Sequence, residues 1–304
     1  MPKPRVTLVN SSDSPALDLG EEGLPDALAE RGIDPQVVSW DDESVDWSDA
    51  GVVVIRSVHN YASRRDDFVA WAKGIRKLLN SADVVDWNTD KHYLQELGQR
   101  GMPTIDTMWL EPDRGFSKHQ VHTRFPSQGD FVVKPAVSSG SRDTGRYTAR
   151  DAVSRMNAIQ HAYGLLQDGR SVMVQRYVKS VDKRGETALI YFNGVLSHAV
   201  EKQAMLLGQL AAPDAVAEEV AVARQATEAE LKLGENARAA IHGHIKSRLG
   251  RDSQLLYCRI DIVEGDDDGP VVMEVSLVDA ALFLGTVPGA LENFADAIAS
   301  RAFW

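Results

Sequence analysis

The chain has 304 residues, enough for two or three packed lobes, and its 43% hydrophobic and 25% charged residues are ordinary for a globular protein. Its formal net charge of −11 repels phosphate backbones, so a nucleic-acid partner is not expected. The lone cysteine, Cys258, excludes an internal disulfide and fits a reducing compartment. No signal-peptide pattern or membrane-length apolar run is present, so we expect a cytoplasmic protein without a membrane partner.

Apolar runs and helical patterns alternate in the first third of the chain. The Val-rich runs 5–10 and 51–57 predict buried strands, and the segment 23–34 between them predicts a helix ended by a glycine. A second helix is predicted over 64–79, because one face carries Phe68, Trp71, Ala72, Ile75, Leu78 and Leu79. A third is predicted over 90–101. This alternation is typical of a parallel sheet with covered faces.

From about residue 115 the pattern is richer in strands. We expect a strand at 130–135, a helix at 151–166 and strands at 171–178, 186–194, 195–200, 255–263 and 270–278. Asn193-Gly194 predicts a tight hairpin between two of these strands. Thr227 and Glu230 have the spacing of a capping box, which predicts the start of a helix with a regular apolar stripe.

The last two predicted strands carry polar residues among apolar ones. Since strand side chains alternate between faces, one face should carry Tyr257, Arg259, Asp261 and, on the partner strand, Val272, Glu274 and Ser276. One interpretation is a salt-bridge cluster of Arg259, Asp261 and Glu274 on a solvated face. The other is a Mg²⁺ site with Asp261 and Glu274 as ligands and Ser276 nearby. Arg259 would then face a developing negative charge.

Lys134 ends an apolar run and precedes Pro135 and a loop of small residues. Gly140 and Gly145 imitate half of a P-loop, but Arg146 follows where that motif requires lysine, so the motif fails. A lysine on a strand, followed by bare backbone N–H groups, still suits phosphate oxygens. The alternative is a surface hairpin with a solvated lysine, which the apolar residues before Lys134 disfavour.

The ordered set of a strand with Lys-Pro and a small loop, then MVQRYV (173–178), then RID and MEVS in the last strands, resembles the ATP-grasp superfamily over about residues 88–280. The resemblance implies an α/β fold in which two α+β lobes, residues 89–180 and 181–304, clasp ATP. A Rossmann-like substrate domain would occupy residues 1–88. The implied activity is an ATP-dependent ligase, with Mg²⁺ or Mn²⁺, that phosphorylates a carboxylate before a nitrogen nucleophile displaces phosphate.

The resemblance also implies roles for individual residues. The nucleotide phosphates would contact Lys134, Lys202 and Lys91, and the covering loop would be Ser138, Ser139, Gly140 and Ser141. The hinge that binds adenine would be Gln175, Arg176, Tyr177 and Val178, with Asp182 on the ribose. Asp261 and Glu274 would hold the metal, and Arg259 would stabilise the reacting centre. Ser276 stands where the superfamily usually has Asn or Glu, which puts a third metal ligand in doubt.

The expected substrate site follows the strand at 51–57. Arg56, His59 and Tyr61 lie where parallel sheets usually bind ligands, and Arg142 lies in the small loop; a solvated loop is the alternative for the first three. The segments 56–72, 88–94 and 185–202 resemble a small branch of ATP-grasp proteins that includes cycloserine-forming cyclo-ligases. This implies intramolecular cyclisation of O-ureido-D-serine to the antibiotic D-cycloserine, with release of ADP and phosphate.

Two other functions stay open at this point. One is a ligase that joins an amino acid or peptide to a separate amine, and the other is a nucleotide-binding regulator without turnover. A transition-state arginine at Arg259 argues against the regulator. The resemblance further suggests a homodimer. The segment 203–219, with Met205, Leu206 and Leu207, is either a lid or a packed strand.

Overall fold

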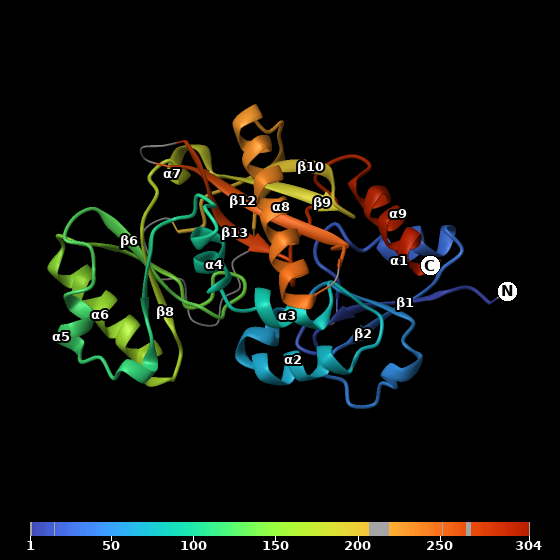
Figure 1. Ribbon diagram of the computed structural model, residues 1–304, viewed down its shortest axis with the longest axis horizontal. Helices are drawn as coiled ribbons and strands as arrows, with labels where there is room; N and C mark the ends of the chain where they lie inside the picture. Colours follow the sequence, from blue (N-terminus) through green and yellow to red (C-terminus); the bar gives the residue numbers. More distant parts are fainter. Residues whose placement is uncertain (1, 15, 207–218, 251, 266–268, 304) are drawn as a thin grey trace.

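The computed structural model describes residues 2–14, 16–206, 219–250, 252–265 and 269–303. Three β-sheets form from successive parts of the chain. The lobe with β6, β8, α5 and α6 lies at one end of the long axis, whereas α1, α9 and both chain ends lie at the other (Figure 1). The predicted α/β class is confirmed.

The first sheet is parallel, with the strand order β2-β1-β3-β4. Its elements are β1 (Arg5–Asn10), α1 (Leu24–Glu30), β2 (Asp34–Ser39), β3 (Val52–Ile55), α2 (Arg65–Gly74), β4 (Leu78–Leu79) and α3 (Ala82–Asn88). The two predicted strands and the helix between them are confirmed, while β2, β4 and α3 are additional. The carboxyl ends of β1 and β3 lead to loops that face the rest of the molecule.

The helix expected over 64–79 is wrong beyond Gly74. Ile75 is extended, with φ −89° and ψ 118°, and Leu78–Leu79 form β4 beside β3. Ile75 and Leu78 nevertheless pack in the same buried cluster as Phe68. The apolar stripe therefore predicted correctly which side chains are buried. The helix ends at a glycine, and Leu78 and Leu79 belong to a strand instead.

The second sheet is antiparallel, with the order β5-β8-β6-β7. It consists of β5 (Thr107–Leu110), β6 (Asp130–Pro135), β7 (Gly145–Thr148) and β8 (Val172–Arg176), after α4 (Tyr93–Gln99). The helices α5 (Lys118–His122) and α6 (Ala152–Gln167) pack on it around Phe131 and Val133. These contacts fix β6, the strand that carries Lys134.

The third sheet has the order β11-β10-β9-β12-β13. It contains β9 (Glu186–Phe192), β10 (Val195–Lys202), β11 (Ala221–Ala223), β12 (Tyr257–Glu264) and β13 (Pro270–Ser276), with α7 (Val181–Arg184) before it. Asn193 and Gly194 both have positive φ in the β9–β10 turn, so the hairpin prediction is confirmed. The capping box of Thr227 and Glu230 starts α8 (Glu228–Leu249), which covers one face of the sheet.

A β-bulge corrects the expected face of Val272. The β12–β13 register shifts between Asp261 and Ile262, so Val272 packs with Ile262 in the core under α8. Met273 and Glu274 both line the cavity described below. An extra residue at a bulge changes which side chains share a face, and strict alternation cannot anticipate it.

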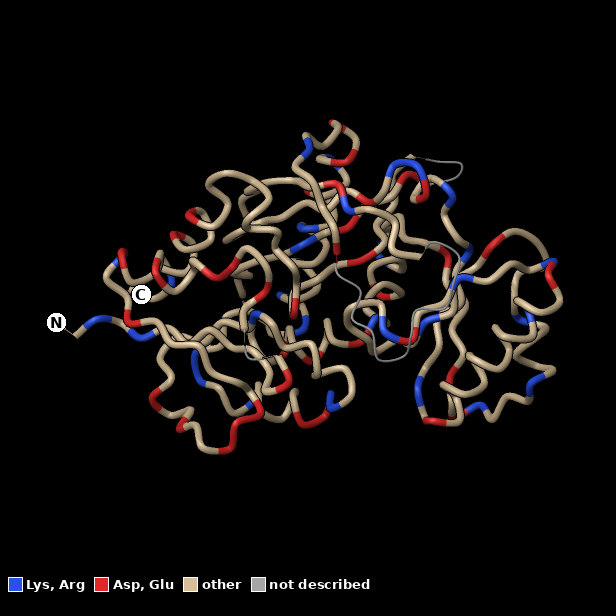
Figure 2. Tube along the Cα trace, turned by 180° about the vertical axis from the view of Figure 1, so that it is seen from behind, with Lys and Arg blue, Asp and Glu red and all other residues tan. Residues whose placement is uncertain are grey.

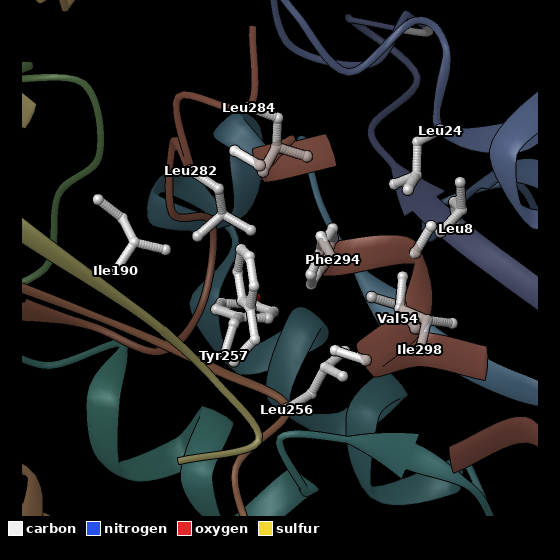
Figure 3. Close-up of a cluster of buried hydrophobic side chains, with 14 of the residues drawn as sticks. Leu8, Leu24, Val54, Ile190, Leu256, Tyr257, Leu282, Leu284, Phe294 and Ile298 are labelled. Atoms are coloured by element: carbon white, nitrogen blue, oxygen red, sulfur yellow. The ribbon is translucent and has the colours of Figure 1, made fainter. Parts of the chain in front are cut away.

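The last helix, α9 (Ala290–Ala302), returns to the start of the chain. Figure 3 shows Phe294 and Ile298 of α9 beside Leu8 of β1 and Val54 of β3, within one buried cluster. The C-terminal part of the chain thus completes the core of the first sheet. The domain limits at 88/89 and 180/181 stay a prediction.

Charges of both signs are distributed along the chain (Figure 2). Among the described helices, none combines the length and apolar character that crossing a bilayer requires. The acidic turn after β12 lies partly outside the described residues. Residues 207–218 of the expected lid segment lie wholly outside them.

Candidate functional site

A cavity of about 780 Å³ lies where the three sheets meet. Its wall includes most of the residues that the sequence predicted: His59, Tyr61, Lys91, Lys134, Ser138, Ser139, Gly140, Ser141, Gln175, Arg176, Tyr177, Val178, Lys202, Arg259, Glu274 and Ser276. These residues come from all three parts of the chain. The fold thus brings the predicted phosphate, hinge, metal and substrate residues to one site.

Lys134 is the least satisfied of the buried cations of this wall. It is buried, and within the described chain its Nζ forms no hydrogen bond or ion pair. Burial lowers the pKa of Lys134, and Lys91 and Lys202 add to this effect, while Glu274 opposes it. A buried ammonium without a close anion is suited to an anionic ligand.

Lys91 connects the small loop to β13. Its Nζ donates to the Ser138 carbonyl at 2.9 Å and lies 3.4 Å from Glu274 Oε1. The backbone N–H of Lys91 donates to the carbonyl of Ala136, directly after β6. The segment before α4 is therefore attached to the start of the loop.

Lys202 lies among three carboxylates at the end of β10. Its Nζ is 2.6 Å from Asp261, 2.9 Å from Glu186 and 3.2 Å from Glu219. Burial disfavours its charge, but these carboxylates raise the pKa of Lys202 above its ordinary value. Lys202 is therefore a fixed positive charge beside Asp261.

Gly185 allows β9 to approach the backbone of Lys202. Its φ of 62° and ψ of −153° lie in a region that essentially only glycine adopts. A Cβ there would lie 2.1 Å from the Lys202 carbonyl oxygen. The position of Lys202 thus depends on this glycine.

Arg259 projects from β12 into the same site. Its guanidinium donates to Asp261 at 3.0 Å, to Glu219 at 3.0 Å and to the Ala281 carbonyl at 3.1 Å. The salt bridge of Arg259 with Asp261 was one interpretation of the sequence, but it is buried and does not lie on a solvated face. A buried guanidinium held at three points is suited to stabilising negative charge at a fixed position.

Asp261 and Glu274 are partners across β12 and β13. Asp261 Oδ2 accepts from Lys202 and Arg259, whereas Oδ1 is buried and accepts no hydrogen bond from the described residues. Asp261 is outside the residues that line the cavity, next to Glu274 on the neighbouring strand. Burial tends to raise the pKa of Glu274, but Lys91, with the other nearby cations, lowers it to about 2.

These two carboxylates fit a hard dication. The buried, unpaired Oδ1 of Asp261 and the ionised Glu274 are oxygen donors of the kind that Mg²⁺ prefers. Within the described chain, no group of three or more His, Cys, Asp or Glu is arranged to hold a metal. Mg²⁺ commonly takes only one or two protein carboxylates and completes its shell with phosphate oxygens and water.

The predicted hinge lies at the apolar end of the cavity. Tyr177 and Val178 follow β8, and they pack with Val132, Val181 and Met273. Such an apolar slot suits a flat ring. Asp182 is outside the cavity wall: its carboxylate accepts from the Tyr177 hydroxyl at 2.5 Å and from Arg146 at 2.9 Å.

Two of the four predicted substrate residues lie outside the cavity wall. Arg56 is fully buried, forms an ion pair with Glu21 and lies against the rings of Tyr257 and Phe294. Arg142 Nη1 donates to the His59 carbonyl at 3.2 Å. Both hold the loops around the cavity in this structure.

Sequence reasoning missed the acidic groups that surround His59 in the cavity wall. Asp18, Glu21 and Asp279 line the cavity, and His59 bridges Asp18 at 2.9 Å and Asp279 at 3.1 Å. The hydrogen bonds that His59 donates to Asp18 and Asp279 raise the pKa of His59 to about 10. Asp18 and Glu21 follow β1, so the carboxyl-end rule that selected His59 applied to them as well.

Comparison with known proteins agrees with this geometry. The family model of the N-terminal domain of D-cycloserine synthetase DcsG matches residues 6–80. The cycloserine biosynthesis protein DcsG of Streptomyces lavendulae is 34% identical over 302 residues, which cover 97% of this chain and 98% of that protein. The chain belongs to the DcsG family of ATP-grasp ligases.

Solved structures support the same assignment. The crystal structure of D-cycloserine synthetase DcsG matches with a TM-score of 0.85 at 34% identity, covering 98% of this chain and 99% of that one. The D-alanine–D-alanine ligase of Bacillus anthracis, solved in complex with ATP, matches with a TM-score of 0.64 at 13% identity over 99% and 97% of the two chains, a likeness of fold. The predictions of an ATP-grasp fold and an ATP-dependent ligase are confirmed, which excludes the regulator without turnover.

Proposed function

We propose that this member of the DcsG family cyclises O-ureido-D-serine to D-cycloserine, with ATP as the phosphoryl donor. The observation that carries the proposal is the continuity of one cavity, from the lysine cluster through Arg259 to the acidic end formed by Asp18 and Asp279. A single compact substrate fits there between the nucleotide end and the first sheet. Membership of the DcsG family supports the choice of this substrate.

The lysine end is assigned to the nucleotide. Lys134 and Lys91 would bind phosphate oxygens under the Ser138–Ser141 loop, and Lys202 would add positive charge from the opposite wall. The adenine ring would lie in the apolar slot at Tyr177 and Val178. The hinge backbone supplies its polar contacts in this proposal, and Asp182 supports the Tyr177 ring instead of a ribose.

Asp261 and Glu274 would hold Mg²⁺. When bound, the ion neutralises phosphate charge and orients the transferred group. Lys202 and Arg259 now contact Asp261 Oδ2, so the free Oδ1 is the oxygen available to a metal. Ser276, at the end of β13, lines the cavity beside this pair and would contribute at most a neutral hydroxyl.

Arg259 and the acidic end would orient the amino acid. The carboxylate that is activated would lie against Arg259, a buried cation of the cavity wall. The α-ammonium would lie toward Asp18 and Asp279. The cations at this end are already paired, Arg56 with Glu21 and His59 with Asp18 and Asp279. Opposite ends of one wall thus match the opposite charges of an amino acid.

The proposed reaction has two covalent steps at the carboxylate and a hydrolytic step that removes the carbamoyl group. A carboxylate oxygen attacks the γ-phosphorus and ADP leaves; the oxygen-bound nitrogen of the same substrate then attacks the acyl carbon and expels phosphate. Arg259 is placed to stabilise the oxyanion that forms at the acyl carbon. Because cycloserine lacks the carbamoyl group of O-ureido-serine, water must remove that group as carbon dioxide and ammonia.

A product assay tests this proposal. The enzyme is supplied with ATP, Mg²⁺ and O-ureido-D-serine, with and without an added amine, and phosphate release is followed together with product mass. Phosphate release without added amine, accompanied by the mass of cycloserine, is expected. Release only with the added amine would assign the enzyme to ligation of two molecules, and the absence of release would overturn the substrate assignment.

A further inference from the structure

The carboxylate of Asp279, in the segment after β13, joins the Ser138–Ser141 loop to the segment that follows β3. Its Oδ2 accepts from the Ser139 hydroxyl at 2.5 Å, and its Oδ1 accepts from the backbone N–H of Val58 at 2.9 Å. It also lies 3.1 Å from His59 Nδ1. The side chain is only 1% exposed, so all these bonds are shielded from water.

The backbone of Asp279 is itself in a costly conformation. Its φ is 52°, in the left-handed region, although it is not glycine. Such conformations persist where surrounding contacts determine them, and they occur often at functional sites. Here the bonds to Ser139, Val58 and His59 are the contacts that hold it.

Besides the bonds from Lys91 to Ser138, the loop that contains Ser139 has few other attachments to neighbouring segments. Tyr61 Oη is 3.5 Å from the Ser138 carbonyl, and Arg142 donates to the His59 carbonyl at 3.2 Å. Gly140 and Ser141 both have positive φ, so the loop turns sharply directly after Ser139. The bond from Ser139 to Asp279 is the shortest of these attachments, and its acceptor is a carboxylate, which makes it a charge-assisted bond.

A continuous chain of bonds extends from this loop to the acidic end. Ser139 bonds Asp279, Asp279 pairs with His59 Nδ1, and His59 Nε2 lies 2.9 Å from Asp18. Asp18 and Asp279 both line the cavity at the end that we assign to the amino acid. A ligand that fixes this pair would also fix the acceptor of the Ser139 bond.

We propose that Asp279 is a positioning residue that couples amino-acid binding to closure of the Ser138–Ser141 loop over the nucleotide phosphates. The inference rests on the proposed function, because it takes the acidic end as the amino-acid site. Its physical basis is one shared carboxylate: an amino acid that binds this end favours the position from which Asp279 accepts the Ser139 hydroxyl. A ligand that favours the closed loop must then bind more tightly when the nucleotide is present, and the reverse holds equally.

Binding measurements test the coupling. The affinity for AMPPNP with Mg²⁺ is measured by calorimetry with and without O-ureido-D-serine. In the wild type the amino acid is expected to tighten AMPPNP binding at least about 5-fold, the lower end of ordinary coupling between sites. In Ser139→Ala and Asp279→Asn the amino acid should tighten AMPPNP binding only about 1–2-fold, below the ordinary range of coupling between sites.

Ser141→Ala is the matched control, since its hydroxyl lies in the same loop but contacts Met205 and not Asp279. This variant should keep the wild-type coupling factor. Equal factors in the wild type and Ser139→Ala would overturn the proposal. Ser139→Ala removes one hydroxyl only, so the test does not depend on whether Asp279→Asn folds.

A second readout needs no amino acid. Amide hydrogen exchange of residues 138–145 is followed with AMPPNP and Mg²⁺ bound, and it should be faster in Ser139→Ala than in Ser141→Ala. Equal exchange in the two variants would overturn the proposal. If the wild type binds no O-ureido-D-serine, the proposed substrate is wrong, while the exchange experiment still decides whether Ser139 holds the loop.

Discussion

Asp261 and Glu274 stand opposite each other on β12 and β13, beside a β-bulge that also turns Met273 toward the cavity. One carboxylate is bonded to Lys202 and Arg259 and the other lies near Lys91. Asp261 therefore joins a lysine of the phosphate end to the arginine of the reacting centre, while Glu274 lies near a second lysine of the phosphate end. This arrangement explains why the pKa of Glu274 is low in a buried setting.

Glu274→Gln should weaken Mg²⁺ activation. The substitution removes one of two proposed ligands, so we expect the apparent Mg²⁺ affinity to fall by at least about 10–100-fold, the effect known for residues that merely support ligands. Turnover at physiological Mg²⁺ should then be nearly lost, and steady-state rates across a Mg²⁺ series measure this. Glu264→Gln, an exposed position on β12, is the control. An unchanged Mg²⁺ dependence in Glu274→Gln would leave only the salt-bridge interpretation.

Lys134→Ala should weaken ATP binding without loss of the fold. Lys134 has no anionic partner among the described residues within ion-pair distance, and burial opposes its charge, so its removal should not lower the free energy of unfolding. One hydrogen bond to a charged group is worth about 1.5–3 kcal/mol, so the Kd for ATP should rise roughly 10–100-fold. Calorimetry measures it, with the exposed Lys179→Ala as control. Unchanged ATP affinity would refute the phosphate role of Lys134.

His59 should make the stability of the protein depend on alkaline pH. Its bonds to Asp18 and Asp279 raise its pKa from 6.5 to about 10 in the folded state. The charged form therefore stabilises the folded protein fully below pH 6.5, and this contribution is lost as the pH rises through 10. His59→Gln should be less stable than the wild type at pH 6, with a difference that shrinks toward pH 10.

Urea unfolding at several pH values measures this difference. The slope that His59 contributes cannot exceed about 1.4 kcal/mol per pH unit. His242→Gln is the control, since that imidazole lies at the surface of α8 near Asp252. A stability difference for His59→Gln that is constant from pH 6 to pH 10 would contradict the ion-pair assignment.

Gly185→Ala should disturb Lys202. The backbone there is in a region restricted to glycine, and the new Cβ would lie 2.1 Å from the Lys202 carbonyl oxygen. We expect a loss of about 1–3 kcal/mol in the free energy of unfolding together with reduced turnover. Gly243→Ala in α8 meets open space and should gain up to about 1 kcal/mol from helix propensity. Thermal unfolding compares the two, and equal stabilities would show that Gly185 is not constrained.

The sequence predicted the parts of the site that depend on local patterns. Lys134 at the end of an apolar strand, the Asn193-Gly194 turn and the capping box at Thr227 each follow from short-range rules, and the structure contains all three. Alternation correctly placed Arg259 and Asp261 on the face opposite Ile260.

The remaining features depend on tertiary contacts. The bulge that moved Val272 to the core is set by the pairing of two strands, and β4 exists because Leu78 found a partner in β3. Arg56 appeared to be a substrate residue, but Glu21 draws it into the core, and no local pattern reports such a pair. Asp279 was missed because its role comes from residues 140 and more positions away in the chain.

The most direct test of the account follows one oxygen atom. O-ureido-D-serine labelled with ¹⁸O in both carboxylate oxygens is supplied with ATP and Mg²⁺, and the released phosphate and the cyclised product are examined by mass spectrometry. Activation of the carboxylate as an acyl phosphate predicts one labelled oxygen in phosphate and one retained in cycloserine. Cycloserine formed together with unlabelled phosphate would contradict the proposed reaction at this site.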